Sequence, residues 1–484
     1  MKRLFAISTL IPVIFLSGCS QIPSYQTPTT ELPNNNDWQA QQSLVSMRLD
    51  LDEKAWLQQL SGDQQLFALI NEALTHNKDI QLAKLNLQQA RLLLEQATAN
   101  QYPELSVNSD LSRTQTSDQA YPVNTQTTYG NFSLGTLLSY ELDIWGRVDA
   151  LKQQAQASLK ASQAEQKTIQ LSVSAAVSQA YLNLMALNQR VYLAQNTVKS
   201  RQEALQLRQT QLEYGAVTPL SVYQAQSELA SVEIALQQQI EQRDLQLHAL
   251  AVLLGRSPKA LTKIDTSTFN TQPLKMVNTL PVPQNLPSKL LERRPDILAM
   301  EQRLIAANAN IGVAKAALFP SISLTGLLGF QSESLKDLFA DGSIAWNTSA
   351  TISAPIFDYG KRQSQVQLSK TQKEALVIQY QHTLRTAFKE VLDALTTLNG
   401  SRQQLQAQQR QVSALSTVLD LAQKRFDAGY SSYLEVLDAQ RNLFNAQLAQ
   451  VTMKLNHSIA LVDLYKALGG NWQSNQQTQN NGAL

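Results

Sequence analysis

The feature that most constrains this chain is a pair of long helical segments that occurs twice along the sequence. In the first occurrence, within residues 149–254, apolar side chains recur every seven residues, as in the seam of a coiled coil. The seam residues are Leu184, Val191, Val198, Leu205 and Leu212. As one helix, residues 149–212 would be roughly 96 Å long. A globular core does not accommodate a helix of that length.

The same pattern returns 214 residues later, and every seam position is again apolar. The second set is Leu398, Leu405, Val412, Leu419 and Phe426. The breaks move with the seams, since Gly215 corresponds to Gly429 and Gly255 to Gly469. Upstream, Pro103 corresponds to Pro320 with an offset of 217. Offsets that preserve both seams and breaks indicate an internal duplication.

Breaks and biased composition divide the chain into six parts. We expect a signal peptide at 1–18, a tether and equatorial segment at 19–65, a first repeat at 66–255, a proline-rich linker at 256–285, a second repeat at 286–470 and a disordered tail at 471–484. Each repeat is expected to contain a helix, a β-hairpin and a long helical hairpin. The first helix is expected to continue to about residue 100.

The hairpins are predicted where the apolar period changes from helical to two. They lie at about residues 104–143 and 321–356, with polar loops at 113–127 and 331–346. Each predicted strand has the roughly 9 to 11 residues that a tilted transmembrane strand needs. Four strands do not close a barrel, and lipid does not tolerate an open edge, so the chain is expected to oligomerise. Two chains would give about eight strands with a filled interior, and three would give about twelve with a lumen.

The N-terminus resembles a bacterial lipoprotein signal. Lys2 and Arg3 precede a short apolar run, which ends in Leu16-Ser17-Gly18-Cys19. The resemblance implies that Cys19 is acylated and becomes the first mature residue, and that Ser20 directs the protein to the outer membrane. The alternative is an ordinary signal peptide with an incidental cysteine. Because Cys19 is the sole cysteine, an internal disulfide is excluded.

Charge and motif content argue against several other classes. The formal net charge of +2 comes with no basic cluster, so a nucleic-acid partner has no support. No nucleophile elbow, phosphate-binding loop or paired-carboxylate motif is present, so we expect no enzyme and no cofactor. The histidines are isolated, which predicts helix-surface residues and no metal site. They are His76, His248, His382 and His457.

The passage from strand to long helix has the same chemistry in both repeats. A glycine follows an aromatic residue and precedes a cation, as a bilayer edge requires. The predicted barrel-edge residues are Trp145, Gly146, Arg147, Tyr359 and Gly360. The alternative for Trp145 is a core side chain. Asp143 and Asp358, beside these turns, are expected to be structural.

Taken together, the motifs resemble those of the outer membrane factors of the TolC-like family, in the lipoprotein branch that serves tripartite efflux pumps. The matching segments are the lipobox ending at Cys19, Tyr140 to Arg147, Arg293 to Ile297, Ala317 to Ile322, Pro355 to Gly360 and Tyr433 to Arg441. The resemblance implies a mainly α-helical chain with a transmembrane β-barrel. It also implies a homotrimer with a twelve-stranded barrel in the outer membrane and a twelve-helix tube in the periplasm.

The resemblance further implies partners and a gate. The partners are a periplasmic adaptor and an inner membrane transporter of the resistance-nodulation-division type, and conduction is passive. Helical tips that contact the adaptor are expected at Gly215, Pro219, Gly429, Tyr430 and Tyr433. The expected periplasmic gate is Leu434, Asp438 and Arg441, whose spacings of four and three place them on one helical face.

Alternatives remain for the gate and for the function. The charged residues are otherwise a solvated surface pair. The first-repeat counterparts Leu220, Gln224 and Ser227 share only the leucine. Within the same fold the chain could be a type I secretion or metal-export conduit. In a different class it could be a structural periplasmic lipoprotein or adaptor.

Overall fold

The computed structural model describes residues 20–28, 64–117, 119, 128–261 and 294–470. The predicted signal peptide, Cys19, the tail and most of the tether and linker lie outside the described residues. The chain divides into two compact units. We call the described parts of 1–29, 87–162 and 299–380 the sheet unit, and those of 30–86, 163–298 and 381–484 the helical unit.

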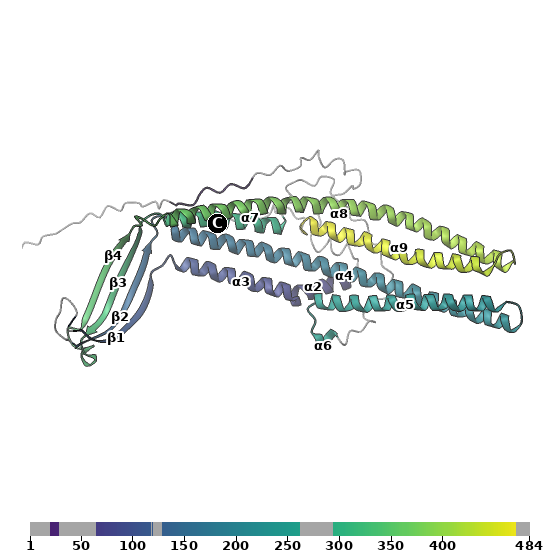
Figure 1. The fold of residues 1–484 in the computed structure, drawn as a ribbon, viewed down its shortest axis with the longest axis horizontal. Helices are drawn as coiled ribbons and strands as arrows, with labels where there is room; N and C mark the ends of the chain where they lie inside the picture. Colours follow the sequence, from purple (N-terminus) through teal and green to yellow (C-terminus); the bar gives the residue numbers. More distant parts are fainter. Residues whose placement is uncertain (1–19, 29–63, 118, 120–127, 262–293, 471–484) are drawn as a thin grey trace, which may run out of the picture. The chain divides into compact units, whose positions relative to one another are not determined.

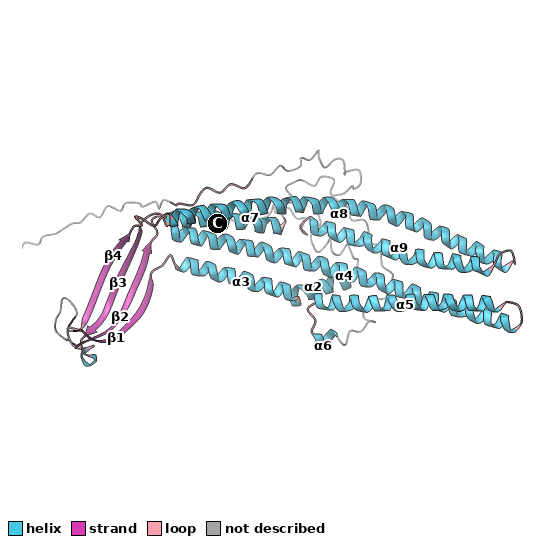
Figure 2. Cartoon of the chain, in the orientation of Figure 1, coloured by secondary structure: helices cyan, strands magenta, loops and turns pink. Residues whose placement is uncertain are grey.

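Eight α-helices are described, in an order that repeats (Figures 1 and 2). They are α2 (Gln64–His76), α3 (Lys78–Ala99), α4 (Arg147–Glu213), α5 (Pro219–Leu253), α6 (Pro258–Leu261), α7 (Pro295–Ala316), α8 (Lys361–Asp427) and α9 (Tyr433–Ala467). Helices α4 and α8 each have 67 residues, and α5 and α9 each have 35. None of the described helices has the length and hydropathy needed to cross a bilayer. The equal lengths are what a duplicated helical hairpin requires.

The sheet unit contains one antiparallel sheet with strand order β1-β2-β3-β4. The strands are β1 (Glu104–Gln115), β2 (Thr128–Leu142), β3 (Ser321–Ser332) and β4 (Ile344–Ser353). A mainly α-helical, duplicated chain with four strands confirms the predicted fold class.

The strands differ in length from those expected. Cross-strand pairing carries β1, β3 and β4 two or three residues into the segments predicted as loops, as in the pair Arg113 and Gly130. The second loop also contains a short 3-10 helix, η4 (Leu335–Asp337). β4 ends at Ser353, three residues before the predicted end of its hairpin. Period-two patterning marks apolar residues, so it misses polar strand ends that are held by backbone pairing alone.

The segment after Cys19, expected to be a tether, is packed where it is described. Ile22 lies against α7 at Gly312, where an added Cβ would be 2.6 Å from Ile22 Cγ1. Asn308 Nδ2 donates to the carbonyl of Pro23 at 2.7 Å. Ser20 Cα would lie 3.3 Å from a Cβ at Gly146. The polar composition of this segment gave no sign of this docking, because a helix glycine and a backbone carbonyl provide the contacts.

The core of the helical unit joins residues from both repeats. Buried side chains of α2, α4, α5 and α9 form one cluster, with Ile70, Leu184, Leu250 and Tyr465 among its members. His457 of α9 is 3% exposed, so the prediction that every histidine lies on a helix surface is wrong. Its Nδ1 lies 3.1 Å from Ser401 Oγ on α8. A buried imidazole at this position is a core residue with one polar partner.

Burial and the nearby Arg402 lower the pKa of His457 below its ordinary value of 6.5. Below pH 6.5, His457 therefore takes up a proton in the unfolded chain. In the folded chain it stays neutral until the pH falls to its lower, folded-state pKa. We expect acidification to destabilise the helical unit by about 1.4 kcal/mol for each pH unit in that window. Thermal unfolding between about pH 7 and pH 5 should show a weaker pH dependence in His457→Gln. Equal slopes would contradict the assignment.

The upstream helix of the first repeat, expected as one run, breaks at Asn77 into α2 and α3. Asn77 Nδ2 donates to the carbonyl of Leu253, at the end of α5, at 2.8 Å. Its Oδ1 accepts from the backbone N–H groups of Asp79 at 2.9 Å and Ile80 at 3.3 Å. Asn77 thus caps α3 and ties it to α5. Helical periodicity continues across the break, so the sequence pattern did not reveal it.

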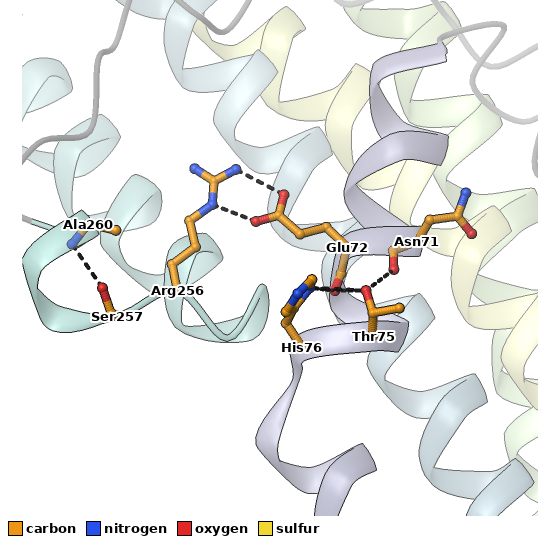
Figure 3. Close-up of polar contacts among 7 residues, drawn as sticks. All are labelled: Asn71, Glu72, Thr75, His76, Arg256, Ser257 and Ala260. Atoms are coloured by element: carbon orange, nitrogen blue, oxygen red, sulfur yellow. Dashed lines mark hydrogen bonds and ion pairs between the residues drawn. The ribbon is translucent and has the colours of Figure 1, made fainter.

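The break is supported from the α5 side. Gly255 has φ +70°, and an added Cβ would lie 2.2 Å from the carbonyl oxygen of His76. Arg256 binds Glu72 through two hydrogen bonds of 2.8 and 3.0 Å (Figure 3). Thr75 Oγ1 bonds the carbonyls of Asn71 and Glu72 in the last turn of α2 (Figure 3). We call this contact between α2 and the end of α5 the joint.

The second repeat makes the same contact with different chemistry. Asn77 corresponds to Arg294, and Leu253 corresponds to Ala467. Arg294 Nη1 donates to the carbonyl of Ala467 at 2.9 Å, and the guanidinium also binds Asp296 and Glu390 at 2.7 Å. In both repeats the acceptor is therefore a backbone carbonyl at the end of the second long helix, whereas the donor changes from an asparagine to an arginine.

Candidate functional site

The tips of both helical hairpins are built by the same turn. After α4, Gly215 has φ +71°, and Ala216 N–H donates to the carbonyl of Gln211 at 2.8 Å. After α8, Gly429 has φ +78°, and Tyr430 N–H donates to the carbonyl of Arg425 at 2.8 Å. This is the Schellman pattern, which ends a helix on a left-handed residue. Pro219 then starts α5 in its first turn, where no N–H is needed.

The predicted tip residues differ in exposure. Around the turns, large apolar and aromatic side chains are solvent-exposed; they are Tyr214, Leu220, Tyr223, Tyr430 and Leu434. Tyr433, expected to contact a partner, is 9% exposed and packs 5.6 Å from Phe426 between ring centroids. Its ring also faces the Arg208 guanidinium at 4.1 Å. Tyr433 therefore holds the second tip together, and Tyr430 is available at its surface.

The three predicted gate residues lie on one exposed face of α9. Leu434, Asp438 and Arg441 are exposed, whereas Leu437 between them is buried. Asp438 Oδ2 accepts a hydrogen bond from Asn442 of the same helix at 3.1 Å. Arg441 Nη2 lies 2.9 Å from Glu228 Oε2 on α5, and their side chains are 54% and 6% exposed. Arg441 thus connects the second repeat to the first.

Sequence reasoning missed the polar residues beneath this ion pair. Arg201 of α4 is buried, and its Nε has no hydrogen-bond partner. Burial lowers the pKa of Arg201, while the nearby Glu228 opposes that effect. The hydrogen bond from Arg441 to Glu228 also raises the pKa of Arg441. Glu228 is therefore a buried carboxylate that lies close to two cations, Arg201 and Arg441. We call Arg201, Glu228 and Arg441 the tip charge cluster.

The sequence contains a signal for Arg201 and for Arg208, the cation that faces Tyr433. Each lies three residues after an apolar seam residue, and this position is the second core position of a heptad. The second repeat has Leu415 and Ala422 at the corresponding positions. A cation at a core position in only one of two repeats marks a site where the tips differ.

The strand-to-helix turn of the first repeat is tightly held. Arg147 binds Glu141 through hydrogen bonds of 2.8 and 2.6 Å. Asp143 accepts from two N–H groups in the first turn of α4, so it is a helix cap. Trp145 is half-buried, donates from Nε1 to the carbonyl of Pro320 at 2.7 Å, and stacks on Phe319 at 4.7 Å. Gly146 adopts φ +71°.

The second turn is open. Asp358 again caps, accepting from the N–H groups of Gly360 at 3.0 Å and Arg362 at 3.2 Å. Gly360 has φ +79°, with nothing within 4 Å of an added Cβ. Tyr359 is 93% exposed and has φ 52°. Among the described residues, the others with a positive φ are all glycines. The two turns share backbone and caps but differ in what covers the aromatic ring.

Among the residues that the structure describes, no group of three histidine, cysteine, aspartate or glutamate side chains is arranged to hold a metal ion.

Comparison with known proteins gives a consistent result. The family model for the outer membrane efflux protein matches residues 69–256 and 286–470. The toluene efflux pump outer membrane protein TtgC of Pseudomonas putida is 36% identical, over 97% of this chain and 97% of that protein. The cation efflux system protein CusC of Escherichia coli O6:H1 is 33% identical, over 95% of this chain and 97% of that protein.

A solved structure agrees with the sequence comparisons. The CmeC outer membrane channel of Campylobacter jejuni matches with a TM-score of 0.85 and 27% identity. The match covers 94% of this chain and 96% of that chain.

Proposed function

This chain belongs to the outer membrane efflux protein family, and we propose that three copies form a passive conduit for drugs and other toxic compounds. The conduit receives its cargo from an inner membrane transporter of the resistance-nodulation-division type through a periplasmic adaptor. It is anchored in the outer membrane by acylated Cys19. The transporter supplies the energy, so this chain has no catalytic role and no cofactor.

The observation that carries the proposal is the four-stranded sheet with two open edges. Both edge strands expose apolar side chains on one face; they are Leu105, Val107 and Leu111 on β1 and Ile344, Trp346 and Ile352 on β4. An apolar face and unpaired edges are compatible with lipid only in a closed barrel. Three copies supply about twelve strands, enough for a lumen.

The tips support the remaining parts of the proposal. The exposed tyrosines and leucines around Gly215 and Gly429 form a surface that an adaptor could cover. The face with Leu434, Asp438 and Arg441 is available to meet its copies in a trimer. An apolar ring resists wetting, and ion pairs can hold neighbouring helices together. We assign the gate to this face and to the tip charge cluster.

A metal-export conduit is the second candidate, because CusC is named as part of a cation efflux system. The test is expression in a Gram-negative host that lacks its own outer membrane efflux channel, together with a drug-exporting pump and adaptor. Several-fold restored resistance to solvents and drugs would support the proposal. Restored resistance to metal cations alone, in a host with a metal-cation pump, would favour the second candidate. Correctly inserted protein that restores neither would overturn both.

A further inference from the structure

The sheet has one apolar face and one polar face. Residues that lie opposite one another in neighbouring strands point to the same side of a sheet, so a row can be followed across all the strands. One such row is Val107, Thr136, Leu328 and Trp346. The alternate residues of β1 are polar; they include Ser106, Asn108 and Asp110. The proposed conduit turns the apolar face to lipid and the polar face to the lumen.

A loop with a short 3-10 helix connects the strands of the second hairpin. The helices join the sheet at one end, because α3 and α7 precede β1 and β3, whereas α4 and α8 follow β2 and β4. Residues 333–343, which contain η4, connect β3 to β4 at the opposite end. We call these residues the η4 loop. In the proposed conduit the helices lie in the periplasm, so the η4 loop lies at the outer surface of the membrane.

The η4 loop is fixed by hydrogen bonds at its base. The N–H of Gln331 donates to the carbonyl of Ser343 at 2.8 Å. Ser343 donates to the carbonyl of Ala340 from its N–H at 3.1 Å and from its Oγ at 2.8 Å. The side chain of Leu338 is buried. The loop therefore has a defined conformation, and its backbone holds the exposed side chains outward.

Two large apolar side chains of the η4 loop are exposed to solvent. Leu335 is 60% exposed and Phe339 is 69% exposed. The Phe339 ring packs edge-on against Phe330, with 5.3 Å between the ring centroids. Phe330 belongs to the apolar face of the sheet, because it lies two residues after Leu328 in the same strand. The η4 loop therefore folds toward the apolar face and extends it beyond the ends of the strands.

The polar face ends in hydrogen-bonded side chains instead. Gln331, the neighbour of Phe330 on the other face, donates from Nε2 to Asn131 Oδ1 at 2.9 Å. Asn131 Nδ2 donates to Asp110 Oδ1 at 3.2 Å. A loop folded over the lumen would place Phe339 beside these polar groups. Its contact with Phe330 places it on the opposite side of the sheet.

We propose that the η4 loop is an anchor in the outer leaflet of the membrane, where Phe339 and Leu335 lie among lipid acyl chains. This inference rests on the proposed conduit and adds to it a lipid contact outside the strands. Lipid is the partner that fits, because Phe339 continues the face that lipid covers in the proposed conduit. Lys336, Asp337 and Asp341 of the same loop are exposed. These charges require water, so the loop lies at the boundary between acyl chains and head groups.

The test is fluorescence quenching in phosphatidylcholine vesicles, with a small fluorophore attached to one introduced thiol. The variants are Phe339→Cys, Leu335→Cys, Asp337→Cys and Val107→Cys. Cys19 is the sole cysteine of the chain and is acylated in the proposed conduit, and the unmodified chain reveals any labelling there. One set of vesicles contains lipid with a nitroxide near the head-group end of its acyl chain. The other set contains iodide on both sides of the membrane.

We expect the nitroxide lipid to quench the probes of Phe339→Cys and Leu335→Cys several-fold more strongly than that of Asp337→Cys. Iodide should give the reverse order. Asp337→Cys is the matched control from the same loop, and Val107→Cys reports lipid at the apolar face of the sheet.

The possible failures are distinguishable. Equal iodide quenching in Phe339→Cys and Asp337→Cys, with lipid quenching in Val107→Cys, would overturn the anchor alone. Protection of Phe339→Cys and Leu335→Cys from both quenchers would also overturn the anchor, because protein would then cover the loop. Folded protein in which Val107→Cys escapes lipid quenching would overturn the proposed function itself.

Discussion

In planar bilayers, we expect large, steady currents from Arg441→Ala and small, flickering currents from the wild-type protein. Arg441 joins α9 to the buried Glu228 on α5. Because the Arg441 side chain is 54% exposed, the link contributes about 1 kcal/mol in each chain. If three copies open together, losing three links changes the open-to-closed ratio by about 3 kcal/mol, or roughly a hundredfold. Single-channel recording measures this directly.

Two further variants sharpen the gate experiment. Glu228→Gln keeps the size of the side chain and removes its charge, so it should reproduce the effect of Arg441→Ala. Lys424→Ala removes a cation near the second tip that pairs with Asp420 on its own helix, at 2.7 Å, and should leave the currents small. Large currents in the wild type that are unchanged in Arg441→Ala and Glu228→Gln would contradict a gate at this ion pair. The gate would then have to be assigned to other residues, such as Leu434.

The second large effect is expected from Gly255→Ala at the joint. An alanine there would have its Cβ 2.2 Å from the carbonyl oxygen of His76, and it would keep φ +70° only with strain. The left-handed conformation alone costs about 1 to 2 kcal/mol, and backbone cannot yield as a flexible side chain does. We expect a total loss of about 3 to 5 kcal/mol. Chemical unfolding of the purified protein should show a clearly lower midpoint.

Gly400→Ala is the matched control for this substitution. Gly400 lies inside α8, and nothing lies within 4 Å of a Cβ added there. Alanine favours a helix interior over glycine by about 1 kcal/mol, so this variant should be slightly more stable than the wild type. A similar loss in both variants, or none in Gly255→Ala, would contradict the tight joint.

The elements and their duplication were predictable because they follow from periodicity. Seven-residue seams and repeated glycines predicted the helical hairpins, and alternation predicted four strands. The break at Asn77 was not predictable, since the side chain that interrupts the helix bonds Leu253, far away in the sequence. The packing of Ile22 on Gly312 and the burial of His457 also depend on tertiary neighbours. Local pattern contains no information about such contacts.

The candidate site was predictable in part. The spacing of Leu434, Asp438 and Arg441 predicted a shared face, and the structure describes them on one exposed face of α9. Their assignment as a gate remains a prediction. Glu228 was not found, because one carboxylate on a long polar helix resembles many others until its partner is known. The arginines at core heptad positions 201 and 208 were visible in the sequence and pointed to the same region.

The two hairpins pair in equivalent registers, because Val107 lies opposite Thr136 and their counterparts Leu324 and Ala350 lie opposite each other. This equivalence has a consequence for how the proposed ring can arise. If the contact between repeats equals the contact between copies, a single repeat already contains every pairing needed for closure. Six half-length chains would then form the same ring as three full-length ones, but all six tips would be identical. A chain that contains two repeats differs in this respect, because one tip carries Glu228 and the other carries Arg441. The two tips of one chain are therefore joined by opposite charges, which identical tips do not allow.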